Sequence, residues 1–156
     1  MNIKTKQFLS YIAKQYNQVT ITSLMKLSYF IDLVSMKEKR KQISDFVYER
    51  YRFGPFNKEI YGYINDLIKE KTLKEKTSYT PSGDEYIIYE FNTTTKTKFD
   101  QLDTHEKKIA DRVINELYGL GPKALAQIAY ETRPMKKIGA KLSNTKGLNK
   151  RLDLAT

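Results

Sequence analysis

The sequence predicts a mainly helical α+β domain, in which helices pack round a central buried helix beside a small antiparallel β-hairpin. Three observations predict this fold class. Residues 21–35 are apolar round most of a helical circumference. Residues 73–91 show the residue types and turn signals of a hairpin. The 156 residues are 40% hydrophobic, enough for one core. We place the domain at residues 1–142 and a basic C-terminal tail at residues 143–156.

The first two helices are predicted from apolar side chains at helical spacing. The first covers residues 3–17, with its lysines facing outward. A short link leads to the second helix, at residues 21–35, for which Thr20 or Thr22 supplies the N-cap. Few polar residues interrupt this second helix, so we expect it to be buried among other elements.

The next segment combines a strand pattern with a helix start. Residues 45–53 alternate with the period of a β-strand, which places Tyr48 and Arg50 on the same side. A glycine and Pro55 then interrupt the pattern. Since proline suits the first position of a helix, we expect a helix over residues 55–71.

Two strands are predicted at residues 73–79 and 85–91. Between them lies Thr80-Pro81-Ser82-Gly83-Asp84, in which proline and glycine are strong turn signals. The order of elements up to this hairpin is helix, helix, strand, helix and hairpin, which resembles a winged helix.

The C-terminal part is predicted as a loop followed by two helices. Residues 92–101 are rich in threonine and lysine and predict the loop. Asp103 with Glu106 three residues later indicates a capping box at the start of the first helix. Pro122 opens a second, short helix, which we expect to stop before Pro134.

The charge favours an acidic partner, and the chain has no feature of a secreted or membrane protein. The formal net charge is +10 and the sequence contains no cysteine, so disulfides are excluded. No apolar run approaches the ~20 residues that span a bilayer, and the N-terminus lacks a signal peptide. We therefore expect a cytoplasmic protein without a membrane partner.

The sequence gives no pattern of catalytic groups. His105 is the only histidine, and its place in a predicted first helical turn is typical of a surface residue. There is no second histidine or cysteine for a zinc site and no glycine-rich phosphate loop. The acidic residues are isolated in turns. We therefore expect no enzyme activity, no metal and no cofactor.

Three stretches resemble the SocA-like antitoxin domain, also called the Panacea domain. The first is Leu24-Met25-Lys26-Leu27-Ser28-Tyr29-Phe30-Ile31-Asp32, and the second is Phe53-Gly54-Pro55. The third runs from Leu125 to Met135, with Tyr130 where the family often has His and Met135 where it often has Trp. The resemblance covers about residues 6–142. The positions that match the family motifs are Leu24, Lys26, Leu27, Tyr29, Phe30, Asp32, Gly54, Pro55, Tyr130 and Pro134.

The resemblance implies a protein-interaction module from toxin–antitoxin or phage-associated loci. Members of this family are thought to neutralise a toxin by binding it, and at least one delivers its toxin to a protease. The expected partner is therefore a cognate toxin, with a protease as a second candidate partner. Tyrosine and other aromatic residues are favoured in interfaces. They are grouped here at the candidate partner-binding residues Tyr48, Tyr51, Phe53, Phe56 and Tyr61. The alternative is that these aromatic side chains close the core.

A small basic DNA-binding regulator remains the alternative function. In that interpretation the helix at residues 55–71 reads DNA, the hairpin forms a wing, and basic residues near the C-terminus contact phosphates. The residues proposed for the phosphate contacts are Arg133, Lys136, Lys137, Lys141 and Lys146.

Overall fold

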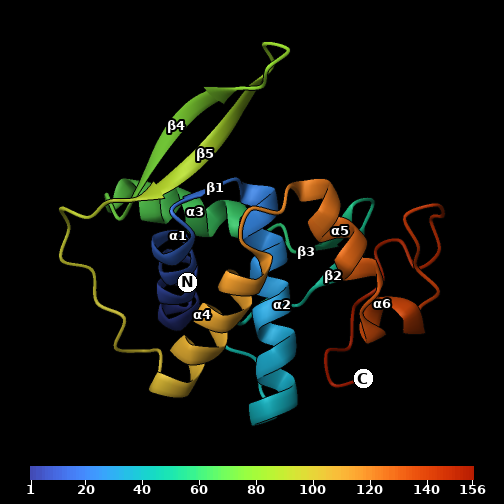
Figure 1. Cartoon of the computed structure of the whole chain (residues 1–156). Coiled ribbons are helices and arrows are strands. Elements are labelled where there is room, and N and C mark those ends of the chain that lie inside the picture. Colours follow the sequence, from blue (N-terminus) through green and yellow to red (C-terminus); the bar gives the residue numbers. More distant parts are fainter.

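The computed structural model describes residues 1–156 and contains six helices and two small antiparallel sheets (Figure 1). The prediction of a mainly helical α+β fold is confirmed. The elements in chain order are α1 (Ile3–Tyr16), β1 (Gln18–Val19), α2 (Ile21–Lys39), β2 (Glu49–Tyr51), β3 (Gly54–Phe56), α3 (Ile60–Lys69), β4 (Leu73–Tyr79), β5 (Glu85–Phe91), α4 (Thr104–Leu117), α5 (Pro122–Tyr130) and α6 (Arg133–Lys137).

Helix α2 is the centre of the fold, as predicted. Every residue from Ser23 to Asp32 is buried, because α1, α4, α5, β3 and β5 all pack against this helix (Figure 1). The hydroxyl of Thr20 accepts a hydrogen bond from the backbone N–H of Ser23 at 3.1 Å and caps the helix. The helix continues to Lys39, beyond the predicted end at residue 35.

The β4–β5 hairpin has the predicted strand limits and projects from the helical body (Figure 1). Its antiparallel register runs from Leu73 opposite Phe91 to Tyr79 opposite Glu85. Residues 18–19, predicted as a link, form strand β1 along the free edge of β5. This edge strand connects α1 to α2 and ties the base of the hairpin to the helices.

The prediction that a helix begins at Pro55 is wrong for residues 55–59. Residues 54–56 form strand β3, in which Pro55 pairs with Arg50 of β2, and helix α3 begins only at Ile60. Gly54 has φ +123°, a conformation that residues with a side chain rarely adopt. The glycine therefore allows a tight turn between β2 and β3. Proline fits the outer strand of a two-stranded ribbon because its missing N–H can face away from the partner strand.

The C-terminal helices follow the predicted signals, and a short helix follows them. Asp103 accepts a hydrogen bond from the backbone N–H of Glu106 at 2.8 Å, and Glu106 accepts one from the N–H of Asp103 at 3.0 Å, which completes the capping box. The helix that opens at Pro122 stops before Pro134, as predicted, because α5 ends at Tyr130. Pro134 belongs to a further short helix, α6. It lies in the first turn of this helix, where the missing N–H of proline has no intrahelical partner to lose.

The segment at residues 143–156, expected to be a basic tail, is not a free extension. Leu152 and Leu154 are buried in the same core as the helices. The backbone N–H of Leu152 donates to the carbonyl of Tyr48 at 2.8 Å, and the N–H of Arg50 donates to the carbonyl of Lys150 at 2.9 Å. The segment is therefore held against the strand region by apolar packing and by backbone hydrogen bonds.

A buried carboxylate joins α2 to the chain that leads into β2. Asp32 is fully buried and accepts hydrogen bonds from the backbone N–H groups of Ile43 and Ser44 at 2.8 and 3.1 Å. The hydroxyls of Ser44 and Tyr48 donate to its second oxygen at 2.5 and 2.7 Å. Burial raises the pKa of Asp32, and these hydrogen bonds act in the opposite direction. Four donors therefore satisfy one carboxylate in the core.

None of the helices combines the length and the apolar character that crossing a membrane requires.

Removing the Asp32 carboxylate is predicted to cost more stability than any single surface change. In Asp32→Ala, four buried donors lose their acceptor, so we expect the free energy of unfolding to fall by about 3–5 kcal/mol. Asp32→Asn keeps one acceptor oxygen and should lose less. Urea unfolding followed by circular dichroism measures both values. An Asp32→Ala loss no larger than that of Asp32→Asn would contradict this role.

The capping box at the start of α4 is predicted to stabilise the fold by an amount that depends on pH. The Lys39 ammonium and the N–H of Glu106 lower the pKa of Asp103 to about 2, from 3.8. The stabilisation is therefore present above pH ~4 and lost as the pH falls towards 2. Asp103→Ala should cost about 1 kcal/mol at pH 7, and this difference should shrink over that interval. Glu116→Ala, at an exposed α4 position, is the control, with no loss expected.

Candidate functional site

Four aromatic side chains of the β2–β3 ribbon and the start of α3 are at least partly exposed, and we call them the aromatic face: Tyr51, Phe53, Phe56 and Tyr61. The rings of Tyr51 and Phe56 lie 4.7 Å apart between centroids, and those of Phe56 and Tyr61 lie 5.8 Å apart. Phe53 is 67% exposed and Tyr61 is 52% exposed. Apolar rings with this exposure are suited to contact with another molecule.

The aromatic face is built from the β2–β3 ribbon and the first turn of α3. Phe53 stands in the turn between the two strands, and Phe56 ends β3. Tyr130 of α5 holds this turn from behind, because its hydroxyl donates to the carbonyl of Arg52 at 2.9 Å. The exposed ring of Phe53 is therefore carried on a turn that is hydrogen-bonded to a helix.

Tyr48 does not belong to the aromatic face, which corrects the sequence prediction. The side chain is only 1% exposed, and its hydroxyl is used by the Asp32 carboxylate. Its ring packs edge-on against Tyr29 at 5.3 Å and against Phe46 at 5.8 Å between centroids. The alternation of residues 45–53 explains this position, since Tyr48 points to the core side of the segment.

A buried lysine lies beneath the same ribbon. Lys26 of α2 is 3% exposed, and its Cε lies 3.6 Å from the position that a Cβ on Gly54 would occupy. Phe56 shares with Gly54 the side of the ribbon that Lys26 approaches, because alternate strand residues point the same way. Burial lowers the pKa of Lys26 to about 8, and no charged or hydrogen-bonding group compensates. The amine therefore has no hydrogen-bonding or ion-pair partner within the chain, although it is not among the nitrogen atoms that are cut off from solvent.

A second buried cation, Arg50, lies on the opposite side of the ribbon, and only one of its side-chain nitrogens has hydrogen-bond partners in the chain. It is fully buried, and one terminal nitrogen donates to the carbonyls of Lys141 and Asn144, each at 2.8 Å. Its guanidinium lies 5.1 Å from the centroid of the Tyr130 ring. Arg50 thus binds the C-terminal segment to the strands, while its Nε and Nη1 remain without a partner in the chain.

The residues that match the family motifs are all buried. Asp32 binds the chain that leads into β2, and the Tyr29 ring packs against Tyr48 of that same cluster. The hydroxyl of Tyr29 lies 2.7 Å from the hydroxyl of Thr132, at the start of α6. Lys26 is the member whose functional group has no role in this internal network.

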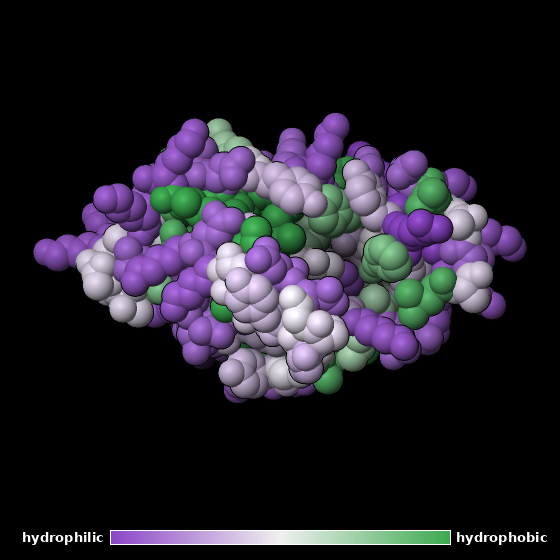
Figure 2. Space-filling model, turned by 90° about the horizontal axis from the view of Figure 1, so that it is seen from above, coloured by the Kyte–Doolittle hydropathy of each residue, from purple (hydrophilic) through white to green (hydrophobic).

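The surface seen from above is mixed in character. Figure 2 shows hydrophobic side chains in several patches, separated by strongly hydrophilic ones. The exposed apolar residues come from the β4–β5 hairpin as well as from the ribbon and α3, and include Tyr79, Ile87 and Tyr61. Apolar contact surface therefore coexists with the high positive charge of the chain.

The groups that DNA binding would need are not gathered on one face. The basic residues from Arg133 to Lys146 are exposed, and α6 lies on the side of the molecule away from the hairpin (Figure 1). Lys136 pairs with Glu131 at 3.4 Å, and Lys137 pairs with Asp153 at 3.9 Å. Helix α3 carries one acid and one base, so it has no excess positive charge for phosphates.

The family model of the antitoxin SocA-like, Panacea domain matches residues 24–134, which is more than half of the chain. The chain belongs to this family. Comparisons with curated proteins and with solved structures give no match.

Membership of the Panacea family supports a role of the toxin–antitoxin type with a protein partner. The matched region begins within α2 and ends in the first turn of α6. It therefore contains Lys26 and the whole aromatic face.

The sequence indicated the aromatic face but not the isolation of Lys26. The apolar residues round Lys26 predict that its side chain is buried. Whether an acidic side chain pairs with it depends on segments that come later in the chain and pack against α2. The Panacea motif includes this lysine without telling what surrounds it. For Arg50 a signal was present, since the alternation placed it on the same side as Tyr48.

Replacing Lys26 by a neutral residue is predicted to stabilise the fold. Lys26→Met keeps the length of the side chain and removes a partly desolvated charge that has no partner within the chain, so we expect a gain of about 1–3 kcal/mol at pH 7. The folded-state pKa, about 8, lies below the usual 10.5. The wild type should therefore gain stability between these pH values, and the variant should not.

Urea unfolding at several pH values measures this difference, with Lys123→Met at an exposed position of α5 as the matched control. A variant that is less stable than the wild type at pH 7 would show that the Lys26 amine has a stabilising partner.

Proposed function

We propose that this Panacea-family protein neutralises a toxin by binding it directly through the aromatic face. The observation that carries this proposal is the group of accessible aromatic rings beside Lys26, a largely buried lysine whose amine has no partner within the chain. The expected mode of action is contact with the toxin and not catalysis.

The composition of the aromatic face supports the proposal. Aromatic residues supply most hot spots of protein interfaces, because a large rigid ring buries much area at a small entropic cost. The ring of Phe56 already lies against those of Tyr51 and Tyr61 in tilted contacts, so little side-chain freedom remains to be lost on binding. Only Phe53, at the turn, stands free of ring contacts and would enter a pocket of the partner.

Lys26 adds a chemical requirement for the partner. An ammonium held in an apolar environment without an acid is costly, and this cost falls when a partner supplies a carboxylate. The toxin surface that binds here would therefore carry an aspartate or glutamate beside an apolar pocket. Such a pair would be shielded from water by the aromatic rings, which strengthens the interaction.

Truncating the two most exposed rings is predicted to abolish neutralisation without affecting the fold. For Phe53→Ala combined with Tyr61→Ala we expect a loss of at least ~2 kcal/mol in toxin binding, roughly 30-fold in affinity. Rescue of growth on co-expression with the toxic product of the neighbouring gene should be lost. The matched control is Tyr79→Ala combined with Tyr118→Ala, two rings that are both 61% exposed at other sites.

Two further measurements separate direct neutralisation from delivery to a protease: inhibition of the purified toxin, and the level of toxin in cells. If the purified protein inhibits the purified toxin, binding alone is sufficient. If the toxin is inhibited only in cells, and its level falls when the antitoxin is present, the proposal of direct neutralisation is wrong and the adaptor route holds. Equal rescue by the double variant and the wild type would remove the aromatic face from the mechanism.

A further inference from the structure

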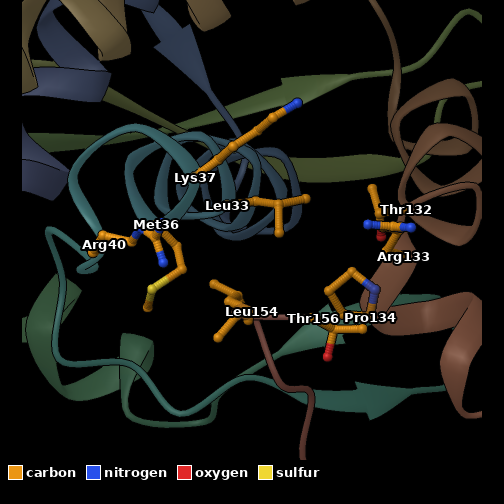
Figure 3. A pocket seen from close by; sticks show the side chains of 10 residues that line it. Leu33, Met36, Lys37, Arg40, Thr132, Arg133, Pro134, Leu154 and Thr156 are labelled. Carbon is orange, nitrogen blue, oxygen red and sulfur yellow. The ribbon is translucent and has the colours of Figure 1, made fainter.

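The C-terminal end of α2 borders a cavity that lies away from the aromatic face. Its volume is about 460 Å³, within the range of ligand-binding pockets. Leu33 and Met36 of α2, Pro134 of α6 and Leu154 near the C-terminus supply apolar walls, and Figure 3 shows their side chains round the opening. Three segments that are far apart in the sequence thus meet round one apolar cavity.

The rim of this cavity is positively charged. Lys37, Arg40 and Arg133 line it (Figure 3), and none of the lining side chains is acidic. All three cationic side chains are exposed, and none takes part in an ion pair within the chain, in contrast to Lys39 of the same helix, which pairs with Asp103. The C-terminal end of a helix favours the first two cations, but Arg133 comes from another element.

We propose that this basic-rimmed cavity binds an acidic segment of a partner protein, with an apolar side chain seated on Leu33 and Leu154 and flanking carboxylates on the rim. Arginine forks match carboxylates in geometry, and three cations without an ion-pair partner in the chain attract an acidic occupant. Nucleic acid fits less well, because the lining residues include no aromatic ring on which a base could stack. The site is distinct from the aromatic face, and its existence does not depend on the proposed toxin binding.

The test uses the full ¹⁵N-labelled chain and a capped hexapeptide of alternating glutamate and leucine. Titration should give saturable chemical-shift changes at residues round Leu33, Arg40 and Leu154. A lysine–leucine hexapeptide of the same length should produce no such changes. If the two peptides behave alike, or if the changes map to the aromatic face, the proposal is wrong.

Charge-reversal variants separate specific binding from attraction to a basic protein. Arg40→Glu combined with Arg133→Glu should weaken the affinity for the acidic peptide at least about tenfold. The control, Lys108→Glu combined with Lys123→Glu, changes the net charge by the same amount at two exposed lysines and should have little effect. If both variants weaken the affinity equally, the peptide binds through the net charge of the protein and the proposed site is wrong.

A third variant tests the apolar floor. Leu33→Asn, at a partly buried position, should weaken peptide binding while circular dichroism shows an intact fold. A short DNA duplex added to the complex should not displace the peptide at moderate salt. Displacement of the peptide from the cavity by the duplex would instead assign this surface to a polyanion.

Discussion

The carboxylate of Asp32 fixes the position of the proposed binding surface from inside the core. It is fully buried and accepts hydrogen bonds from N–H or O–H groups of Ile43, Ser44 and Tyr48. Because a buried carboxylate without donors is strongly disfavoured, α2 and this segment keep one relative position. Strand β2 begins directly after Tyr48, so the ribbon that carries the aromatic face starts from this anchored point. An interaction far from the surface thus determines where the surface rings stand.

Two buried cationic side chains, Arg50 and Lys26, lie on opposite sides of the ribbon and differ in the partners that the chain gives them. Arg50 donates to two backbone carbonyls and lies against the Tyr130 ring, so its charge is used to attach the C-terminal segment. Its guanidinium is also more weakly hydrated than an ammonium, which lowers the cost of burial. Lys26 has no such partner. The fold therefore tolerates an unfavourable amine beside exposed rings, a pattern expected where function and not stability selects the residue.

The sequence predicts the local features of this fold and misses those that depend on distant contacts. The limits of β4 and β5, the cap at Thr20 and the capping box at Asp103 follow from signals a few residues long. By contrast, the sequence Gly54-Pro55 fits both the start of a helix and a tight turn between two strands. Which of the two forms depends on whether Pro55 finds Arg50 as a strand partner. The C-terminal segment is basic in composition and mostly exposed, but the buried side chains of Leu152 and Leu154 hold it against the core. The cavity beside Arg133 joins residues nearly a hundred positions apart, which no local pattern reveals.

The two departures from the Panacea pattern are accommodated within the core. Met135 is fully buried, and a flexible thioether can fill an irregular space left by a larger ring. Tyr130 is 5% exposed and keeps a donor, since its hydroxyl binds the carbonyl of Arg52. A tyrosine also stays neutral at physiological pH, where a histidine would titrate. The turn that presents Phe53 is therefore held by a hydrogen bond that does not depend on pH near 7. Tyr130 thus helps to hold the turn of the aromatic face, whereas Met135 serves the packing of the core.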